Sequence, residues 1–358
     1  MAALDFQPAR PVIPLLDGRD DPVAILPPGS VAALQSDILG KRGFTLNLYM
    51  KTADFISRRW LARTQTRLLP ELRRIRDSHP VPGLYAINTS YDWACTAFVA
   101  DQGSAPILRR TLDWPFPGLG RRAIVLCRKG PAGEYFDVTW PGAVGVLTAN
   151  APGRFAASLN QAPMRRRFKG AIFGPGWTLD LIRNAWTTWR RPIGEPPLHL
   201  LRRVFDEARD FDAALKLIAE APVTRPALFA LAGIRPGETA IIEREETVAR
   251  VFRGALALAN DWREPRPGWQ ARPCALEDPA ECSFTRMAAI EREAFAAETP
   301  FAWAKPPVVN WNTRLAVELS AASGLLRAQG YEPDPGSDAS ARPATAVLEI
   351  SGQKQAPA

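Results

Sequence analysis

The order of the predicted helices and strands is the feature of this sequence that most constrains its fold. Helical spacing of apolar residues covers residues 30–79, and short strand-like runs separated by turn residues follow up to residue 159. A second helical block, a second group of strands, one more helix and a final hairpin come after. Because the strands cluster in groups instead of alternating with helices, the order predicts an α+β protein with two antiparallel sheets covered by helices.

Apolar periodicity and turn residues also predict the individual elements. The expected strands are 84–88, 96–100, 107–112, 123–127, 135–139, 144–148, 155–159, 228–234, 239–243, 247–252, 255–260, 314–319 and 325–329. The expected helices of the second half are 178–190, 198–209, 211–219 and 284–295. These elements divide the chain into a Pro-rich N-terminal arm (1–30), a helical segment (31–94), a main domain (95–332) and a flexible tail (333–358).

The basic helical region before residue 79 has two interpretations. Apolar residues such as Phe55, Trp60 and Leu72 recur at helical spacing, and arginines such as Arg59 and Arg73 occupy the other side. The region either packs its apolar side on the core with a solvated basic face, or lies on an anionic membrane surface. The net charge of +8 suits either interpretation. The sequence has no nucleic-acid-binding signature, so nucleic acid is not an expected partner.

The start of the chain and its cysteines bear on location. The first residues have neither a basic region nor an apolar one, and no run of about 18 apolar residues occurs, so we expect a soluble cytoplasmic protein. The four cysteines show no CxxC pairing, which argues against a zinc site. Cys274 and Cys282 could form a disulfide in an oxidising compartment, but for a cytoplasmic protein we expect free thiols.

Cys95 opens a predicted strand and has few candidate general bases. The chain has only two histidines, His79 and His199, so a Cys–His enzyme would depend on one of them. Cleavage of the Ala94–Cys95 bond would instead give the cysteine an α-amino group, whose reference pKa of about 7.7–8.0 suits a general base. The residues thus predict a nucleophile at a new N-terminus, with a buried structural cysteine as the alternative.

Four segments carry a resemblance to a known family. They are Cys95–Ala100 with Arg110–Trp114, Gly145–Thr148 with Pro152–Asn160, Ala257–Trp262, and Ser283–Arg286. In order and residue type they resemble the N-terminal-nucleophile hydrolases, most closely the branch of acid ceramidase and N-acylethanolamine acid amidase. Bile-salt (choloylglycine) hydrolases and penicillin acyltransferases are wider relatives. The resemblance covers roughly residues 84–330 and implies a four-layer αββα sandwich, with 31–94 as the pro-segment and 95–332 as the catalytic part.

The resemblance also implies roles. Cys95 would be the nucleophile and, after cleavage at Ala94–Cys95, the base. Asp113 would hold its amine, and Arg110 would position the substrate carbonyl and lower the thiol pKa. Asn260 would donate to the oxyanion, and Arg286 would brace the site. The substrate-binding residues would be Trp114, Phe116 and Asn160.

The residues alone leave other interpretations of these positions open. Arg110 and Asp113 could form a plain hairpin-end ion pair, Asn260 could be a turn residue, and Arg286 a solvated surface arginine. The aromatic rings of Trp114 and Phe116 could equally pack in the core.

The resemblance implies a hydrolase of linear amide C–N bonds in an N-acyl, fatty-acyl-like substrate, without metal or organic cofactor. An anionic membrane surface and a second copy of the chain are further candidate partners. Gln161 stands where this branch usually has glutamate, so the substrate stays open. The alternatives are an acyltransferase that uses another amine as acceptor, a catalytically silent lipid-binding relative, and a papain-like Cys95–His199 protease.

Overall fold

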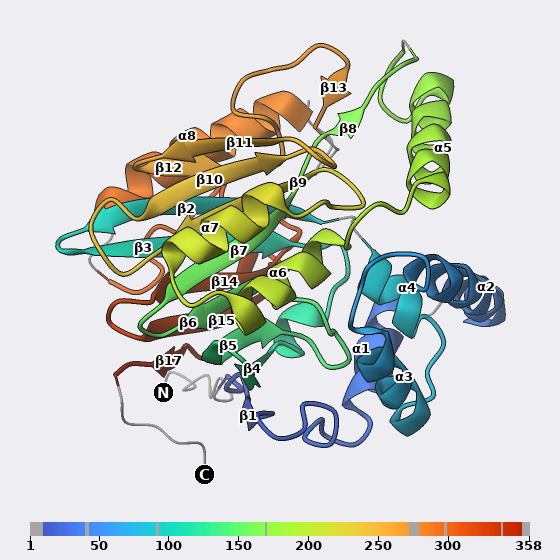
Figure 1. The fold of residues 1–358 in the computed structure, drawn as a ribbon, viewed down its shortest axis with the longest axis horizontal. Helices are drawn as coiled ribbons and strands as arrows, with labels where there is room; N and C mark the ends of the chain where they lie inside the picture. Colours follow the sequence, from blue (N-terminus) through green and yellow to red (C-terminus); the bar gives the residue numbers. More distant parts are fainter. Residues whose placement is uncertain are drawn as a thin grey trace, which may run out of the picture.

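Two stacked β-sheets form the centre of the molecule in the computed structural model, which describes residues 10–39, 43–90, 93–168, 170–271, 279–296, 299–337 and 339–352 (Figure 1). The first sheet is antiparallel except for β1, which runs parallel to β4. Its strands in spatial order are β1 (Leu15–Asp17), β4 (Ile124–Gly130), β5 (Gly133–Thr139), β6 (Thr148–Ala151), β7 (Phe155–Gln161), β9 (Ala227–Ala232), β10 (Thr239–Arg244) and β11 (Ala249–Arg253). The N-terminal arm therefore contributes an edge strand to this sheet.

The second sheet is antiparallel throughout. Its strands in spatial order are β12 (Leu256–Leu258), β2 (Ala94–Gln102), β3 (Ala105–Asp113), β14 (Thr313–Ser320), β15 (Leu325–Pro333) and β16 (Ala341–Pro343), with β17 (Leu348–Ile350) also paired to β15. A small separate ribbon joins β8 (Met164–Arg165) to β13 (Trp269–Gln270).

Helices cover the outer faces of both sheets. On the first sheet lie α6 (Pro197–Glu207) and α7 (Phe211–Glu220), and on the second lies α8 (Pro279–Ala296). At one end of the sandwich gather α1 (Ser30–Leu39), α2 (Gly43–Leu61), α3 (Leu69–Ser78) and α4 (Leu84–Thr89), with α5 (Pro175–Arg190) beside them (Figure 1). A short 3₁₀ turn, η1, spans Leu119–Arg121. The predicted four-layer αββα sandwich is thus confirmed.

The apolar residues explain the layers. The largest buried cluster contains side chains from both sheets, so the two sheets pack face to face through it. Its members include Val99, Leu112, Leu159 and Leu231. A second cluster lies where α8 meets the second sheet, and a third lies between the N-terminal helices and the edge of the first sheet. Alternation of side chains along each central strand supplies apolar groups to both faces, as a sheet covered on two sides requires.

The hairpin of β2 and β3 places three predicted site residues by register. A two-residue loop closes it at Gly103–Ser104, and Gly103 has a φ of 64°, the left-handed region that such tight loops need. The pairing then sets Ala94 opposite Asp113 and Ala97 opposite Arg110. Cys95 and its two candidate partners therefore lie together at the far end of one hairpin.

The predicted strand at 84–88 is wrong, because these residues form helix α4. A short apolar run does not distinguish strand from helix. A residue distant in sequence caps this helix and so favours it over a strand. The carboxylate of Asp54 on α2 accepts hydrogen bonds from the backbone N–H groups of Gly83 (2.6 Å) and Ala86 (3.0 Å). This satisfies amides that a helix start leaves open.

Two further expectations are corrected. The strand predicted at 144–148 begins only at Thr148, because the amides before it bond outside the sheet: Val144 N–H to the Asn88 side chain and Val146 N–H to the Leu198 carbonyl. The tail predicted to be flexible contains β16 and β17, and β17 buries Ile350 at 3% exposure against β15. The apolar run of Val347–Ile350 supplies the physical reason.

The cysteines differ from expectation at one position. Cys95 and Cys127 are free and buried, whereas Cys282 is disulfide-bonded, so the prediction of a free thiol there is wrong. Cys274 lies outside the described residues. The division of the chain into arm, pro-segment and catalytic part stays a prediction.

Candidate active site

The backbone of Cys95 is held by side chains where a neighbouring strand has ended. Strand β12 pairs with β2 only up to Leu258, opposite Ala97. Two residues beyond that end, the Asn260 side chain takes over: its Oδ1 accepts the Cys95 backbone N–H at 2.9 Å. On the other side, the Cys95 carbonyl accepts from Nη1 of Arg286 at 2.7 Å. The backbone N–H and the backbone carbonyl of Cys95 are therefore both held by predicted site residues.

The Cys95 thiol is fully buried and paired to a guanidinium. Nη2 of Arg110 lies 2.7 Å from Sγ, while Nη1 of Arg110 donates to the carbonyl of Leu147 at 2.9 Å and to the Thr148 hydroxyl. Burial raises the pKa of the thiol to about 11, and the charge of Arg110 is the largest influence in the opposite direction. In this uncleaved chain the thiol is protonated at neutral pH, next to a cation that would stabilise its thiolate.

Asp113 lies at the end of β3, with its carboxylate buried. Oδ1 accepts from the Thr313 hydroxyl at 2.8 Å, Oδ2 accepts from the Asn310 amide at 2.9 Å, and Nη1 of Arg286 lies 3.5 Å from Oδ2. Burial raises the pKa of this carboxyl, and Arg286 opposes the rise most strongly. Asp113 is the partner of Ala94 in the ladder, so the residue itself lies beside the start of β2.

Arg286 is buried in α8 and connects the other groups. Besides the Cys95 carbonyl, its guanidinium donates to Thr96 Oγ1 at 2.7 Å and to Asn260 Oδ1 at 2.9 Å. The helix is pressed onto the second sheet by apolar contacts of residues such as Ile290, which fixes the arginine stem. The alternative of a solvated surface arginine is therefore wrong, since Arg286 is 1% exposed.

Side-chain hydrogen bonds of Asn160 and Asn260 link the two sheets. The Asn160 amide on β7 donates to the carbonyls of Leu258 (3.5 Å) and Ala259 (3.1 Å), which directly precede Asn260. Asn260 in turn donates from Nδ2 to the backbone carbonyl of Gln161 at 3.0 Å. Asn160 faces the second sheet, so strand alternation turns the Gln161 side chain to the opposite face of β7. The hydrogen bond from Asn260 therefore goes to the main chain of Gln161.

The remaining predicted residues lie outside this network. Trp114 is buried and packs edge-on against the rings of Trp93, Phe116 and Trp140, with centroid separations of 6.0, 5.9 and 5.8 Å. A substrate-binding role for Trp114, Phe116 and Asn160 stays a prediction. His199 lies buried on α6, where Nδ1 is 2.6 Å from the Thr66 hydroxyl and burial lowers its ring pKa to about 3. That ring is neutral and engaged away from Cys95.

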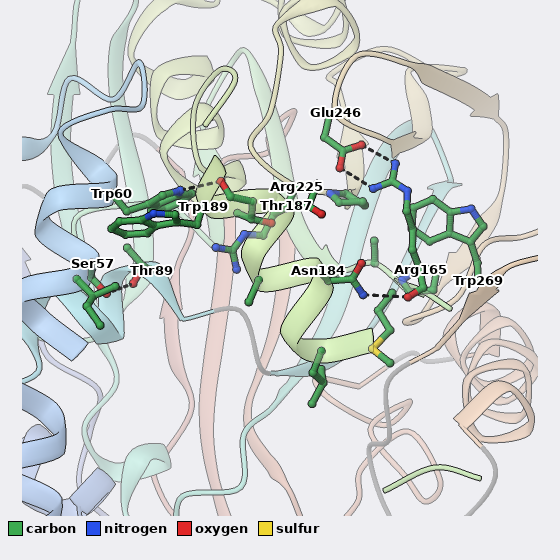
Figure 2. Close-up of a pocket in the computed structure, with 18 of the residues that line it drawn as sticks. Ser57, Trp60, Thr89, Arg165, Asn184, Thr187, Trp189, Arg225, Glu246 and Trp269 are labelled. Carbon is green, nitrogen blue, oxygen red and sulfur yellow. Dashed lines mark hydrogen bonds and ion pairs between the residues drawn. The ribbon is translucent and has the colours of Figure 1, made fainter. Parts of the chain in front are cut away.

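A cavity of about 580 Å³ lies beside the network, between α2, α5 and the chain that follows β7 (Figure 2). Its wall includes Ala162, one residue beyond Gln161, and Thr89, six residues before Cys95. Figure 2 shows the rings of Trp60 and Trp189 at one end and the Arg165–Glu246 ion pair beside Trp269 at the other. No sequence motif indicated this cavity, because its lining comes from segments far apart in the chain.

The described residues can also be tested for metal sites and membrane spans. Within them, no group of three or more His, Cys, Asp or Glu side chains is placed to hold a metal ion. None of the helices in the described part of the chain combines the length and hydrophobicity needed to cross a bilayer.

An αββα sandwich with a cysteine at the start of a central strand, flanked by arginine, aspartate and asparagine, is the arrangement that the resemblance to the N-terminal-nucleophile hydrolases predicted. The comparisons with known proteins agree. The chain is 25% identical to the N-acylethanolamine-hydrolyzing acid amidase of Cavia porcellus over 254 residues, and 29% identical to a probable acid ceramidase of Caenorhabditis elegans over 124 residues. These relatives confirm the acid ceramidase-like branch that the sequence motifs predicted.

The extent of these similarities is partial. The match to the Cavia porcellus amidase covers 68% of this chain and 63% of that protein, and the match to the ceramidase covers 35% and 28%. A solved structure of the Caenorhabditis elegans N-acylethanolamine-hydrolyzing acid amidase ortholog superposes with a TM-score of 0.47 at 17% identity, covering 64% of this chain and 93% of that one. No protein-family model matches the chain.

Proposed function

We propose that this protein hydrolyses the linear amide bond of an N-acyl amide through an acyl-enzyme on Cys95, after it has cleaved its own chain between Ala94 and Cys95. The observation that carries the proposal is the contact network around the backbone and thiol of Cys95. Asn260 and Arg286 hold the Cys95 backbone, while Arg110 touches its thiol. A merely structural cysteine has no need for two buried guanidinium groups and an amide.

The first step would be an acyl shift within the chain. Sγ of Cys95 attacks the Ala94 carbonyl, the C–N bond breaks, and the Cys95 nitrogen keeps its proton and gains the thiol proton. Asn260 Oδ1 accepts from that nitrogen in the uncleaved chain, so it would orient the leaving amine. Water then hydrolyses the Ala94 thioester, which leaves a carboxylate on Ala94 and a free α-amine and thiol on Cys95.

The same groups would act on substrate in the second step. The α-amine takes the thiol proton, the thiolate attacks the substrate carbonyl, and the tetrahedral oxyanion forms near Asn260. One N–H of the Asn260 amide donates to the Gln161 carbonyl, and the other is the candidate oxyanion donor. Such a donor is typically worth about 10²–10³ in rate. Protonation from the ammonium releases the substrate amine, and water hydrolyses the thioester.

The cavity is our candidate for the acyl-chain site. Its volume of about 580 Å³ is within the ordinary range for ligand pockets, and Trp60, Trp189 and Leu181 give it apolar walls. Its position beside Gln161 connects it to the main-chain carbonyl that orients Asn260. The named substrates of the relatives fit this assignment, since an N-acylethanolamine also joins an acyl chain to a small amine through an amide.

The test is the intact mass of purified protein before and after Cys95→Ala substitution. Wild type should give fragments 1–94 and 95–358 and release free acid from N-acyl amides, whereas the variant should stay one inactive chain. Cys127→Ala is the matched control, because Cys127 is also buried and free. An uncleaved wild-type chain that is fully active would refute the mechanism. An added amine that yields a transfer product instead of free acid would favour the acyltransferase.

A specific surface also supports an anionic membrane as the source of substrate. Exposed apolar side chains lie on α2 and α5, and they include Tyr49 and Ile56, which also line the cavity. Arginines flank them: Arg59 lies over the ring of Phe55 and Arg190 over that of Trp186. The members of this surface are Tyr49, Phe55 and Ile56 on α2, Leu179, Ile182 and Trp186 on α5, and Phe173 just before α5.

Flotation with vesicles tests this surface. Wild type should float with anionic vesicles and less with zwitterionic ones, and Ile182→Asp should reduce flotation. Val251→Asp on β11 is the control, since Val251 is exposed at 41% away from α2 and α5. Equal flotation of both variants with wild type would overturn the membrane assignment.

A further inference from the structure

The carboxylate of Asp113 is held by a turn whose residues have no role in the reaction proposed above. The turn spans residues 310–313 and is closed by its own bonds. The Asn310 backbone N–H donates to the Thr313 hydroxyl at 2.9 Å, and the Thr313 N–H donates to the Asn310 carbonyl at 2.9 Å. The Asn310 side-chain oxygen accepts the Asn312 N–H at 2.9 Å. This leaves the Asn310 amide nitrogen and the Thr313 hydroxyl proton to donate to Asp113.

A β-bulge aims this turn at Asp113. In the pairing of β14 with β3, Thr313 lies opposite Asp113 and Leu315 lies opposite Leu112, so Arg314 is an extra residue on β14. The Arg314 guanidinium donates hydrogen bonds to the carbonyls of Phe116 (2.8 Å) and Thr313 (2.7 Å). Bulges of this kind re-aim side chains next to functional sites. In a regular ladder continued from the Leu315–Leu112 pair, Arg314 and not Thr313 would lie opposite Asp113.

The charged and titratable groups that face Asp113 come from all the elements around it. They are Arg286 on α8, Arg110 on β3, Arg314 on β14 and the Cys95 thiol on β2. Burial raises the pKa of the Asp113 carboxyl, and Arg286, Asn310, Thr313 and Arg110 lower it. The neutral donors Asn310 and Thr313 therefore help to keep the buried Asp113 carboxylate charged.

We propose that Asn310 and Thr313 are positioning residues that hold the Asp113 carboxylate charged and aimed at the nitrogen of Cys95. The inference rests on the proposed function and on the role that the family resemblance implies for Asp113, which is to hold the α-amine after cleavage. An ionised carboxylate has about four lone-pair sites, and the turn occupies one on each oxygen, so room remains for the amine. The ladder pairing of Ala94 with Asp113 places the new N-terminus beside that carboxylate.

The experiment measures kcat and KM against pH for cleaved wild type, Thr313→Val, Thr313→Ser and Asn310→Ala. Thr313→Val and Asn310→Ala should move the acidic limb of kcat/KM upward by roughly one pH unit and lower kcat about ten-fold at neutral pH, with KM nearly unchanged. Thr313→Ser keeps the hydroxyl and should behave as wild type. Thr139→Val is the control, because Thr139 is a buried threonine of the first sheet.

The outcomes separate this inference from the proposed function. If wild type is cleaved and depends on Cys95, but the Thr313→Val and Asn310→Ala profiles superimpose on it, the positioning role is wrong and the hydrolase stands. If Cys95→Ala is as active as wild type, both are wrong. Should Thr313→Val not fold, Asn310→Ala alone decides, and an unshifted acidic limb there overturns the inference.

Discussion

Replacing Arg286 by methionine tests how much the contact network around Cys95 contributes to the free energy of unfolding. The experiment uses the Cys95→Ala background, so that every molecule is one uncleaved chain. Methionine retains much of the length of the arginine stem but has no charge and no donor. In the folded chain this removes the bonds to the Cys95 carbonyl, to Thr96 Oγ1 and to Asn260 Oδ1, which measure 2.7, 2.7 and 2.9 Å.

The expected loss of stability follows from the buried carboxylate that the substitution leaves without its partner. Arg286 and Asp113 are 1% and 0% exposed at their side chains, and 3.5 Å separates Nη1 from Oδ2. Removing one member of such a buried pair typically costs about 3–5 kcal/mol, because the other charge stays buried without it. That is a large part of the roughly 5–15 kcal/mol by which domains are stable. In an Asp113→Asn background the same change should cost distinctly less, since no buried carboxylate then remains.

Urea unfolding followed by tryptophan fluorescence measures this free energy. Arg292→Met is the matched control: it lies on the same helix, its side chain is 73% exposed, and it should change stability by about 0.5 kcal/mol or less. A loss below about 1 kcal/mol for Arg286→Met, equal to that of Arg292→Met, would refute the reading of Arg286 as the structural link of the site.

Two further predictions concern Asp137, which pairs with the buried Arg128 of β4, and Gln161, whose main chain bonds to Asn260. Burial raises the pKa of the Asp137 carboxyl to about 6, above its ordinary value of 3.8, so its contribution to stability is present below pH 4 and is lost as pH rises through 6. The free energy of unfolding of the Cys95→Ala chain, minus that of the same chain with Asp137→Asn, should therefore fall between pH 4 and 7, and a difference that rises would contradict the sign. Gln161→Met should leave the rate of self-cleavage within about two-fold of wild type, since Asn260 bonds to the Gln161 main chain; a loss of a hundred-fold, seen by mass spectrometry, would show that the side chain acts.

The part of the site that sequence predicts well is the part built by one hairpin. Cys95, Arg110 and Asp113 lie on adjacent strands joined by a two-residue loop, so their register follows from local turn chemistry. Asn260 and Arg286 come from distant segments, and only the family resemblance suggested them. The structure brings both to the Cys95 backbone, while their catalytic roles stay predictions.

The parts that sequence missed depend on partners far along the chain. Helix α4 is capped by Asp54 from α2, some thirty positions earlier, which no local pattern reveals. Thr313 meets Asp113 across 200 positions and only because a bulge shifts the register. Composition also could not separate surface arginines from structural ones: Arg110, Arg128 and Arg286 are all nearly inaccessible to solvent.

The parallel strand β1 has a practical consequence for anyone who expresses this protein. Residues before the proposed cleavage point complete the edge of the first sheet at β4, and Glu71 on α3 pairs with the buried Arg128 of β4 at 3.1 Å. We expect a gene that starts at Cys95 to produce a chain with an open strand edge and an arginine lacking part of its countercharge. Active material would then require co-expression of the upstream segment from a second cistron, as the template on which the larger piece folds.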